Sequence, residues 1–334
     1  MTFDDKYYKE TIAKYNYNPM DFAPMDFEFC GIPKSTMKAK WLCHSGIDNI
    51  DTTNRNSFIV TTGVGLSGIP HMGTLSQILR AIFLQKNGVN VQIVMGDLDS
   101  YNARNKDLQY VIELSKRYEE FIISLGFDTK KGILRNQYDF PKLNQNAYLL
   151  SKYVTDQDFA DTEEDLSKLY IEKKVYDGIT FSVKQAILLM ISDFISLSDN
   201  YKNIVVMLGL EEHKYVRLAR NMMERMGNES NLYSMYSKII TGLNGYPKMS
   251  KSIHGSAISV DMSSEEIAKK IVEQSNDYDV PENSVIYQMM TSVSDYDVSD
   301  LNLIYDECLS KSVYWEKRKK EYAERLGRIC ENWI

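Results

Sequence analysis

Cysteine is scarce in this 334-residue chain, and its distribution excludes several kinds of site. Cys30, Cys43, Cys308 and Cys330 are scattered and form no Cys-x-x-Cys pair, which argues against a zinc site and against a disulfide framework. We interpret Cys43 and His44, the one adjacent Cys/His pair, as a partly buried local pair rather than as metal ligands. The sequence therefore predicts no metal site built from side chains, and it favours a reducing, cytoplasmic location.

Long apolar runs and an excess of positive charge are also lacking. No segment approaches the roughly 20 apolar residues that span a bilayer, and the N-terminal MTFDDKYYKET is polar and acidic, unlike a signal peptide. We therefore expect no membrane partner. The formal net charge of −7 argues against a protein that coats nucleic acid through its overall charge, although a local basic patch can still bind it.

Strand-like and helix-like segments alternate along the first two thirds of the chain. The expected order is strand 57–63, helix 71–88, strand 89–104, helix 108–126, strand 203–209 and helix 211–227. This alternation predicts an α/β fold with a parallel sheet. Ligands of such sheets bind beyond the carboxyl ends of the strands.

Composition divides the chain into three parts. Residues 1–56 have weak periodicity and are expected to form an N-terminal extension that packs onto the α/β domain. Residues 57–262 form that expected domain, with a polar helical insertion near 128–180. A C-terminal helical domain is expected over 263–334, where Ser263 and Glu266 form a capping box.

A glycine-flanked loop, GYPKMSKSIHGSAI (residues 245–258), carries the strongest chemical signal. Its Lys-Met-Ser-Lys-Ser core places two ammonium groups and two hydroxyls on one segment. Such a loop can close over a triphosphate and stabilise the charge that develops on departing pyrophosphate. A solvated lysine loop is the alternative, but five specified residues rarely occur together by chance.

Two short segments together resemble a known family. HMGT at 71–74 and KMSKS at 248–252 are similar to the HIGH and KMSKS signatures of class I aminoacyl-tRNA synthetases, and residues 35–330 resemble the tryptophanyl and tyrosyl branch. The resemblance implies a Rossmann-like parallel sheet of the class I synthetase (HUP) type, with a C-terminal helical domain that binds tRNA. It also implies ATP and Mg²⁺ as cofactors, a homodimer, and a fold closest to that of the tryptophanyl enzymes.

The resemblance assigns roles to individual residues. The implied catalytic residues, which act on phosphate oxygens and on departing pyrophosphate, are His71, Thr74, Lys248 and Lys251. Thr74 replaces the family's last histidine but keeps a hydrogen-bond donor. The implied ATP-binding residues are Gly65, Gly68, Gly73, Glu211, Met249, Ser250 and Ser252, with Glu211 at the ribose.

Residues 186–195 (AILLMISDFI) resemble the helix that selects tryptophan in the bacterial tryptophanyl enzymes. Met190 and Asp193 match its methionine and aspartate. At a spacing of three they share one helix face, where the carboxylate can accept the indole N–H and the thioether can pack on the ring. A core methionine and a helix-end charge are the alternative interpretation.

Other positions in the implied amino-acid site depart from the family. Ala186 replaces an aromatic residue, Glu212 a glutamine, and Thr61 a residue that is often tyrosine, so the site can suit a modified or different amino acid. Glu212 is expected at the α-ammonium group, because a carboxylate beside the substrate carboxylate would be unfavourable. Asp97 and Asp99 are further candidates for that ammonium, with plain N-capping as the alternative.

A basic cluster near the C-terminus can bind tRNA, with a solvated helix face as the alternative. It comprises Lys311, Lys317, Arg318, Lys319, Lys320 and Arg325. The sequence thus predicts ATP-dependent activation of an amino acid, tryptophan first, and its transfer to tRNA. Two alternatives remain open: a paralogue that activates a different or modified amino acid in specialised metabolism, and a non-catalytic regulator that binds tRNA or an amino acid.

Overall fold

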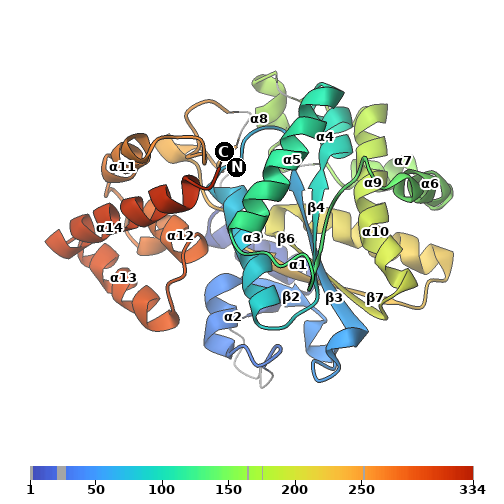
Figure 1. Ribbon diagram of the computed structural model, residues 1–334, viewed down its shortest axis with the longest axis horizontal. Coiled ribbons are helices and arrows are strands. Elements are labelled where there is room, and N and C mark those ends of the chain that lie inside the picture. Colours follow the sequence, from blue (N-terminus) through green and yellow to red (C-terminus); the bar gives the residue numbers. More distant parts are fainter. Residues whose placement is uncertain (1–2, 21–27, 164, 175, 251–252, 334) are drawn as a thin grey trace.

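A computed structural model describes residues 3–20, 28–163, 165–174, 176–250 and 253–333. Its centre is a seven-stranded sheet in the order β1-β2-β7-β6-β3-β4-β5 (Figure 1). The strands are Asn18–Pro19 (β1), Cys43–Ser45 (β2), Phe58–Gly65 (β3), Val91–Gly96 (β4), Ile133–Asn136 (β5), Asn203–Gly209 (β6) and Asn231–Ser237 (β7). The five strands from β7 to β5 run parallel, whereas β1 and β2 are antiparallel to their neighbours. The expected parallel sheet is confirmed, with an antiparallel edge.

The central strands form where the sequence is continuously apolar or β-branched. β4 is buried at every residue and β6 at all but its ends, as is usual for strands covered by helices on both faces. β4 ends at Gly96, earlier than the sequence pattern predicts, because Asp97–Ala103 form a helix, α4. Two aspartates in the first turn of α4 suit the positive end of the helix dipole.

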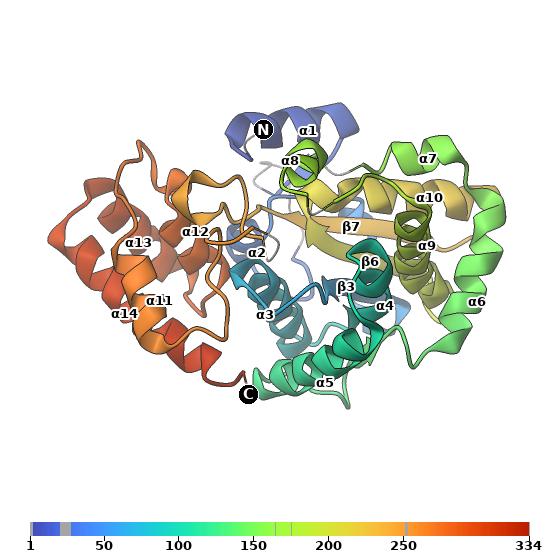
Figure 2. The same ribbon diagram turned by 90° about the horizontal axis from the view of Figure 1, so that it is seen from above.

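Helices cover both faces of the sheet (Figures 1 and 2). α3 (Met72–Lys86) and α5 (Leu108–Ser124) contribute to one apolar core cluster. α9 (Phe181–Ile195) and α10 (His213–Met226) contribute to a second cluster, together with α6 (Pro141–Leu150). The helices expected after the first and third strands are confirmed.

The N-terminal region joins the sheet instead of only packing onto it. In the chain, β1 follows α1 (Asp5–Tyr15) and β2 follows α2 (Lys34–Lys40). β1 pairs with β2, and β2 pairs with β7 through Cys43 and Tyr236. Very short strands, and a strand as polar as β7, carry little of the apolar pattern on which a strand prediction depends. Cys43 and His44 are completely buried, not partly buried as expected.

The segment 128–180 contains several short helices, and it also supplies strand β5 at the edge of the sheet. After α6 it contains α7 (Asp156–Ala160) and α8 (Ser167–Glu172). Short 3-10 helices connect the larger elements at Ile47–Asn49, Arg55–Ser57, Ser151–Tyr153, Ser196–Asp199, Leu210–Glu212, Leu243–Gly245 and Pro281–Asn283.

Four helices form a C-terminal unit on the left of Figure 1. They are α11 (Ser264–Val272), α12 (Val285–Ser292), α13 (Val298–Ser310) and α14 (Val313–Cys330). The capping box of Ser263 and Glu266 is confirmed at the start of α11. Trp315 of α14 is completely buried in the core of this unit.

One helical segment, Phe181–Asp199, is long and apolar enough to cross a membrane by length and composition, with a mean hydropathy of 1.4. The sequence-based statement that no segment approaches this length is therefore wrong. Within the fold, 61% of this stretch is buried, and its apolar side chains belong to the second core cluster. It packs here as a core helix.

Candidate active site

A pocket of about 220 Å³ opens at the carboxyl ends of β3, β6 and β7, beside the N-terminus of α3. The sheet contributes Gly63, Gly65 and Gly209, whose missing side chains leave the backbone accessible to a ligand. Residues 248–250 line it from the loop that follows β7. This is the position at which open α/β sheets bind their ligands.

His71 is the N-cap of α3 and one wall of the pocket. Its Nδ1 accepts hydrogen bonds from the backbone N–H groups of Gly73 and Thr74, at 3.0 and 3.4 Å. Because Nδ1 is an acceptor, the proton of the neutral imidazole lies on Nε2. A Cβ at position 73 would lie 2.7 Å from His71 Cε1, so glycine is needed for this cap. The wall therefore combines an imidazole N–H donor with the positive end of a helix dipole, which suits phosphate.

Lys248 supplies a positive charge to the same pocket. Its Nζ lies 3.8 Å from Oε1 of Glu211, and the two side chains are 22% and 18% exposed. The same Nζ lies 5.7 Å from the ring centroid of Tyr170. Next to it, Met249 is buried and donates its backbone N–H to the carbonyl of Ile240 at 3.2 Å, which anchors this part of the loop.

The pocket brings together most of the residues expected at the ATP site. They are His71, Thr74, Lys248, Gly65, Gly73, Glu211, Met249 and Ser250, joined by Glu212 from the expected amino-acid site. Gly68 is not among the lining residues, because it lies beyond the pocket, where its carbonyl accepts the Tyr118 hydroxyl at 2.8 Å. Lys251 and Ser252 lie outside the described residues. The sequence analysis missed further lining residues, namely Ser67, Gln77, Arg104, Tyr170 and Lys238.

Asp99 lies near the pocket wall and also belongs to the polar cluster described below. A Cβ at Gly96 would be 3.1 Å from Asp99 Oδ2 and 3.5 Å from the carbonyl oxygen of Val64, which lines the pocket. Asp97 is completely buried, and its Oδ1 accepts the backbone N–H groups of Leu98, Gln137 and Tyr138 at 2.9–3.2 Å. Asp97 thus holds the turn after β5 against α4, in addition to starting that helix.

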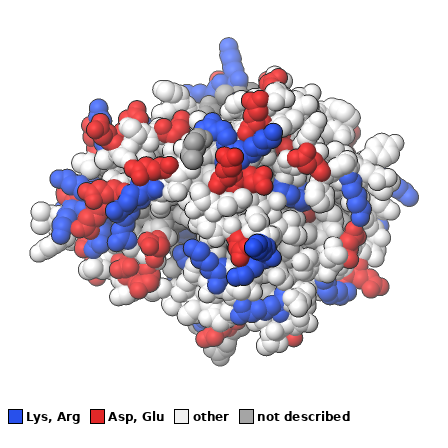
Figure 3. All heavy atoms as spheres, viewed as in Figure 1, with Lys and Arg blue, Asp and Glu red and all other residues white. Residues whose placement is uncertain are grey.

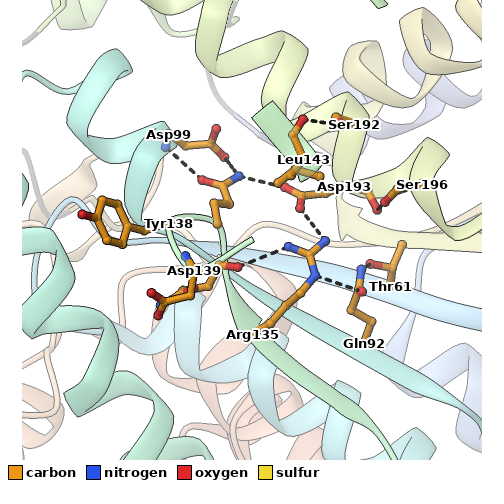
Figure 4. Close-up of polar contacts among 12 residues, drawn as sticks. Thr61, Gln92, Asp99, Arg135, Tyr138, Asp139, Leu143, Ser192, Asp193 and Ser196 are labelled. Carbon is orange, nitrogen blue, oxygen red and sulfur yellow. Dashed lines mark hydrogen bonds and ion pairs between the residues drawn. The ribbon is translucent and has the colours of Figure 1, made fainter. Parts of the chain in front are cut away.

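Six side chains, Thr61, Gln92, Asp99, Arg135, Gln137 and Asp193, form a connected polar cluster beside the pocket (Figure 4). Arg135 Nη2 donates to Asp193 Oδ1 at 2.6 Å. Gln137 Nε2 donates to Asp193 Oδ2 at 2.7 Å and to Asp99 Oδ2 at 3.0 Å. Gln92 Nε2 donates to Thr61 Oγ1 at 3.0 Å, and Arg135 Nε donates to Gln92 Oε1 at 3.4 Å.

This cluster sets the environment of three residues that the sequence assigns to the amino-acid site. Asp193 is 2% exposed and is ion-paired with Arg135, so it is a buried carboxylate and not a solvated charge at the helix end. Thr61 is completely buried, whereas Met190 is half-buried and packs on the second core cluster, as in the alternative interpretation. None of these three residues borders the pocket, so their contact with an amino acid stays a prediction.

Burial dominates the protonation of the carboxylates. It raises the pKa of Asp193 to about 6, against the opposing effects of the Arg135 charge and the Gln137 hydrogen bond. Burial and the neighbouring Asp193 raise the pKa of Asp99 well above its usual range. The pKa of Asp97 is also raised by burial. The cluster is therefore rich in carboxyl groups and poor in groups that would stabilise their ionised forms.

Comparison with known proteins identifies the family. The model of the class I tRNA synthetases (W and Y) matches residues 53–329. The chain belongs to this family. Among its relatives are the tryptophan–tRNA ligase of Methanocaldococcus jannaschii, 28% identical over 65% of this chain, and the tyrosine–tRNA ligase of Methanobrevibacter smithii, 26% identical over 64%. The chain spans 58% and 64% of the length of these two relatives.

Solved structures share the fold of this synthetase-family chain. The tryptophanyl-tRNA synthetase of Aeropyrum pernix matches with a TM-score of 0.80 at 22% identity, covering 98% of this chain and 92% of that one. The tyrosyl-tRNA synthetase of Archaeoglobus fulgidus, complexed with L-tyrosine, matches with a TM-score of 0.69 at 18% identity, covering 84% and 90%. The expected class I synthetase fold is confirmed.

The sequence analysis did not identify three members of the polar cluster, Arg135, Gln137 and Gln92. The first two lie on β5 or directly after it, in a segment with no apolar pattern. Gln92 was the available signal, since a glutamine within the apolar strand VQIVMG needs a buried polar partner.

The C-terminal basic cluster of this synthetase-family chain is divided among ion pairs. Lys319 is 2% exposed and pairs with Glu316 at 3.0 Å, so its expected contact with tRNA is corrected to a structural role. Arg318 pairs with Glu307 at 2.8 Å, Lys317 with Glu321 at 3.6 Å and Arg325 with Asp295 at 3.4 Å, while Lys311 lies over the ring of Tyr278. Figure 3 shows acidic and basic side chains interspersed over this unit, on the left, rather than one basic patch.

Proposed function

We propose that the chain activates an amino acid with ATP, forming an aminoacyl-adenylate, and transfers the acyl group to tRNA. Tryptophan is the first candidate. One observation carries the proposal: His71 and Lys248, from the two signature segments, line one pocket at the carboxyl ends of the strands. The names of the relatives support it, because both tryptophan and tyrosine ligases are among them.

The reaction needs no protein nucleophile, because the amino acid's own carboxylate attacks the α-phosphorus of ATP. Catalysis then consists of positioning and neutralisation of charge. His71 Nε2–H and the N-terminus of α3 hold phosphate oxygens, and Thr74 adds a hydroxyl. Lys248 leaves Glu211 and stabilises the departing pyrophosphate. Gly65 and Gly73 allow the backbone to approach the nucleotide, and Lys251, Ser250 and Ser252 complete the loop.

The α-ammonium of the amino acid is placed at Asp99, with Glu212 on the pocket side. Within the described part of the chain, Asp99 Oδ1 and Asp97 Oδ2 are buried oxygens with no hydrogen-bond partner. An ammonium group brings three N–H donors and a positive charge to this acidic region. The side chain of the bound amino acid would then extend toward Asp193 and Thr61.

Mg²⁺ is proposed to enter with ATP. Among the described residues, no group of three or more His, Cys, Asp or Glu side chains can hold a metal ion. Mg²⁺ is usually held by substrate phosphates with one or two carboxylates, and Glu211 and Glu212 are the carboxylates that border the pocket. The donors thus fit a phosphate-bound ion, which would neutralise phosphate charge.

A homodimer in the cytoplasm is the proposed assembly. Tyr148 and Leu149 of α6 are 79% and 60% exposed, and Phe181 at the start of α9 is 76% exposed. The two helices pack side by side, with the Ser192 hydroxyl bonded to the Leu143 carbonyl near the other end of the pair. Apolar side chains that are exposed together in one patch mark interaction sites. A second copy is the proposed occupant, and tRNA is the proposed nucleic-acid partner.

The deciding experiment is ATP–pyrophosphate exchange by the full chain with each of the twenty amino acids. Exchange with tryptophan is expected, followed by charging of tRNA. Exchange with another amino acid alone would refute tryptophan and support the altered-site alternative. No exchange with any of them would refute activation of a standard amino acid and would favour either a modified amino acid as substrate or the non-catalytic regulator.

A further inference from the structure

The polar cluster has one cation for its acidic groups. Asp97, Asp99 and Asp193 all lie around Gln137, and within the described residues Arg135 makes the only ion pair with any of them. Three buried carboxylates with one guanidinium are unfavourable unless each negative charge is compensated or protonated. The state of Asp193 therefore depends on Arg135.

Arg135 is itself held in one position. Its side chain is 8% exposed. Nη1 donates to the carbonyl of Asn136 at 3.3 Å, and Nε donates to Gln92 (Figure 4). The ring of Phe140 lies 5.0 Å from the guanidinium carbon. A guanidinium fixed on three sides fixes in turn the carboxylate to which it is bonded.

Asp193 keeps acceptor capacity in this arrangement. An ionised carboxylate has about four lone-pair sites. Arg135 uses one on Oδ1 and Gln137 uses one on Oδ2. An N–H on the ring of a bound amino acid can therefore add a hydrogen bond without displacing Arg135.

We propose that Arg135 is a positioning residue for amino-acid selection, because it holds Asp193 as a fixed carboxylate acceptor for a ring N–H of the substrate. This inference rests on the proposed function. Without the guanidinium, Asp193 would stand beside Asp99 with no counter-charge and would take up a proton at neutral pH. A protonated, unanchored carboxyl group would no longer distinguish a ring with an N–H from one without. A fixed acceptor discriminates strongly, because a ligand that lacks the donor leaves a buried polar group unpaired.

The test compares tryptophan with 3-(3-benzothienyl)alanine, an isostere in which sulfur replaces the indole N–H. Wild-type chain, Arg135→Met and Arg135→Lys are assayed by ATP–pyrophosphate exchange between pH 6 and 8.5. For Arg135→Met we expect the KM for tryptophan to rise at least about tenfold at pH 7, the KM for ATP to stay within about twofold, and the preference for tryptophan over the isostere to fall at least about tenfold. The tryptophan KM should recover as the pH rises, and Arg135→Lys should restore part of the preference.

Two further variants distinguish an effect on amino-acid selection from a general effect on folding. Arg225→Met removes an arginine that is paired with Asp158 at 2.7 Å on the surface, so it is the matched control and should change neither KM. Arg135→Met/Asp193→Leu removes both charges and leaves neither buried and unpaired. It should keep the ATP KM and show no preference between tryptophan and the isostere.

An unchanged preference in Arg135→Met, or an equal rise of the KM values for tryptophan and ATP, would overturn the proposal. If the wild type exchanges with another amino acid only, the tryptophan assignment fails. The Arg135 inference then requires that Arg135→Met raises the KM for that amino acid more than the KM for ATP, and an equal rise overturns it. If the wild type exchanges with none, activation of a standard amino acid fails separately. Calorimetric binding of tryptophan then decides, since absent wild-type binding or an equal Kd in Arg135→Met overturns the inference.

Discussion

The pocket beside α3 and the polar cluster around Arg135 and Asp193 are neighbouring polar regions, but they are built differently. Glycines, a helix N-terminus and an imidazole leave the pocket open to solvent. In the cluster, side chains from separate elements bond to one another, and most of them are almost completely buried. A site for phosphate can be made from backbone and a few donors, whereas a site that selects a side chain needs groups fixed by their neighbours.

Removing Lys248 should give the largest effect and test whether the pocket alone acts on the reacting phosphates. For Lys248→Ala we expect the exchange rate to fall about 10²–10³-fold, because a charge that stabilises departing pyrophosphate is lost. The amino-acid KM should change little. Lys202→Ala, an exposed lysine bonded to the Glu229 carbonyl, is the control. A loss below about threefold in Lys248→Ala would mean that the loop does not serve the leaving group.

Gly73→Ala tests whether the open pocket depends on the His71 cap. The added Cβ would lie 2.7 Å from His71 Cε1, so the imidazole must move. We expect the KM for ATP to rise about tenfold, as one positioned donor is displaced. Stability should change by less than about 1 kcal/mol, since alanine's higher helix propensity offsets a weakened cap. The Tm measured by calorimetry checks the expected stability, and exchange kinetics check the KM for ATP. An unchanged KM for ATP would contradict the role of the His71 cap.

Buried His213 and Asp193 of the polar cluster should change the stability of the fold with pH in opposite senses. His213 follows Glu212 at the start of α10, is 1% exposed and bonds through Nδ1 to the Tyr17 hydroxyl at 3.0 Å. Burial lowers its pKa to about 4. The unfolded chain therefore binds this proton more tightly, so the contribution of His213 is present above about pH 6.5 and is lost as the pH falls toward 4.

Urea unfolding between pH 4.5 and 7.5 measures this contribution, which is at most about 3 kcal/mol. His213→Asn should flatten the acid side of the stability curve. Asp193 acts in the opposite sense, because its pKa is raised to about 6 and its contribution decreases as the pH rises toward that value. If the free energy of unfolding falls with decreasing pH as steeply in His213→Asn as in the wild type, other groups cause the loss of stability in acid.

Thr61→Val should give the smallest effect, confined to the cluster. It removes the hydroxyl that accepts Gln92 Nε2–H at 3.0 Å while keeping the side-chain shape. We expect the free energy of unfolding to fall by about 1 kcal/mol, the usual cost of one such hydrogen bond. The ATP KM should not change. Thr53→Val, at an exposed threonine bonded to Asp51, should be close to neutral, and an equal loss in both variants would contradict the assignment.

The fold was predictable from its central strands and helices. β3, β4 and β6 coincide with apolar runs, and α3 has a helical apolar pattern that starts at the His71 cap. β5 and β7 were not predictable in this way, because one has four residues at the edge and the other is polar. The same weak pattern hid the contribution of the N-terminal region to the sheet.

The phosphate side of the site could be recognised from local sequence. His71, Gly73 and Thr74 are neighbours in the chain, so the cap and the helix N-terminus form together, and the KMSKS loop identifies its partner. The amino-acid side depends on tertiary packing. Arg135 and Asp193 are 58 residues apart, and Gln137 and Asp193 are 56 apart. In the sequence, a lone arginine near a sheet edge looks like a solvated residue. Only the tertiary structure buries Arg135 and places the Asp193 carboxylate beside it, which a buried charge requires.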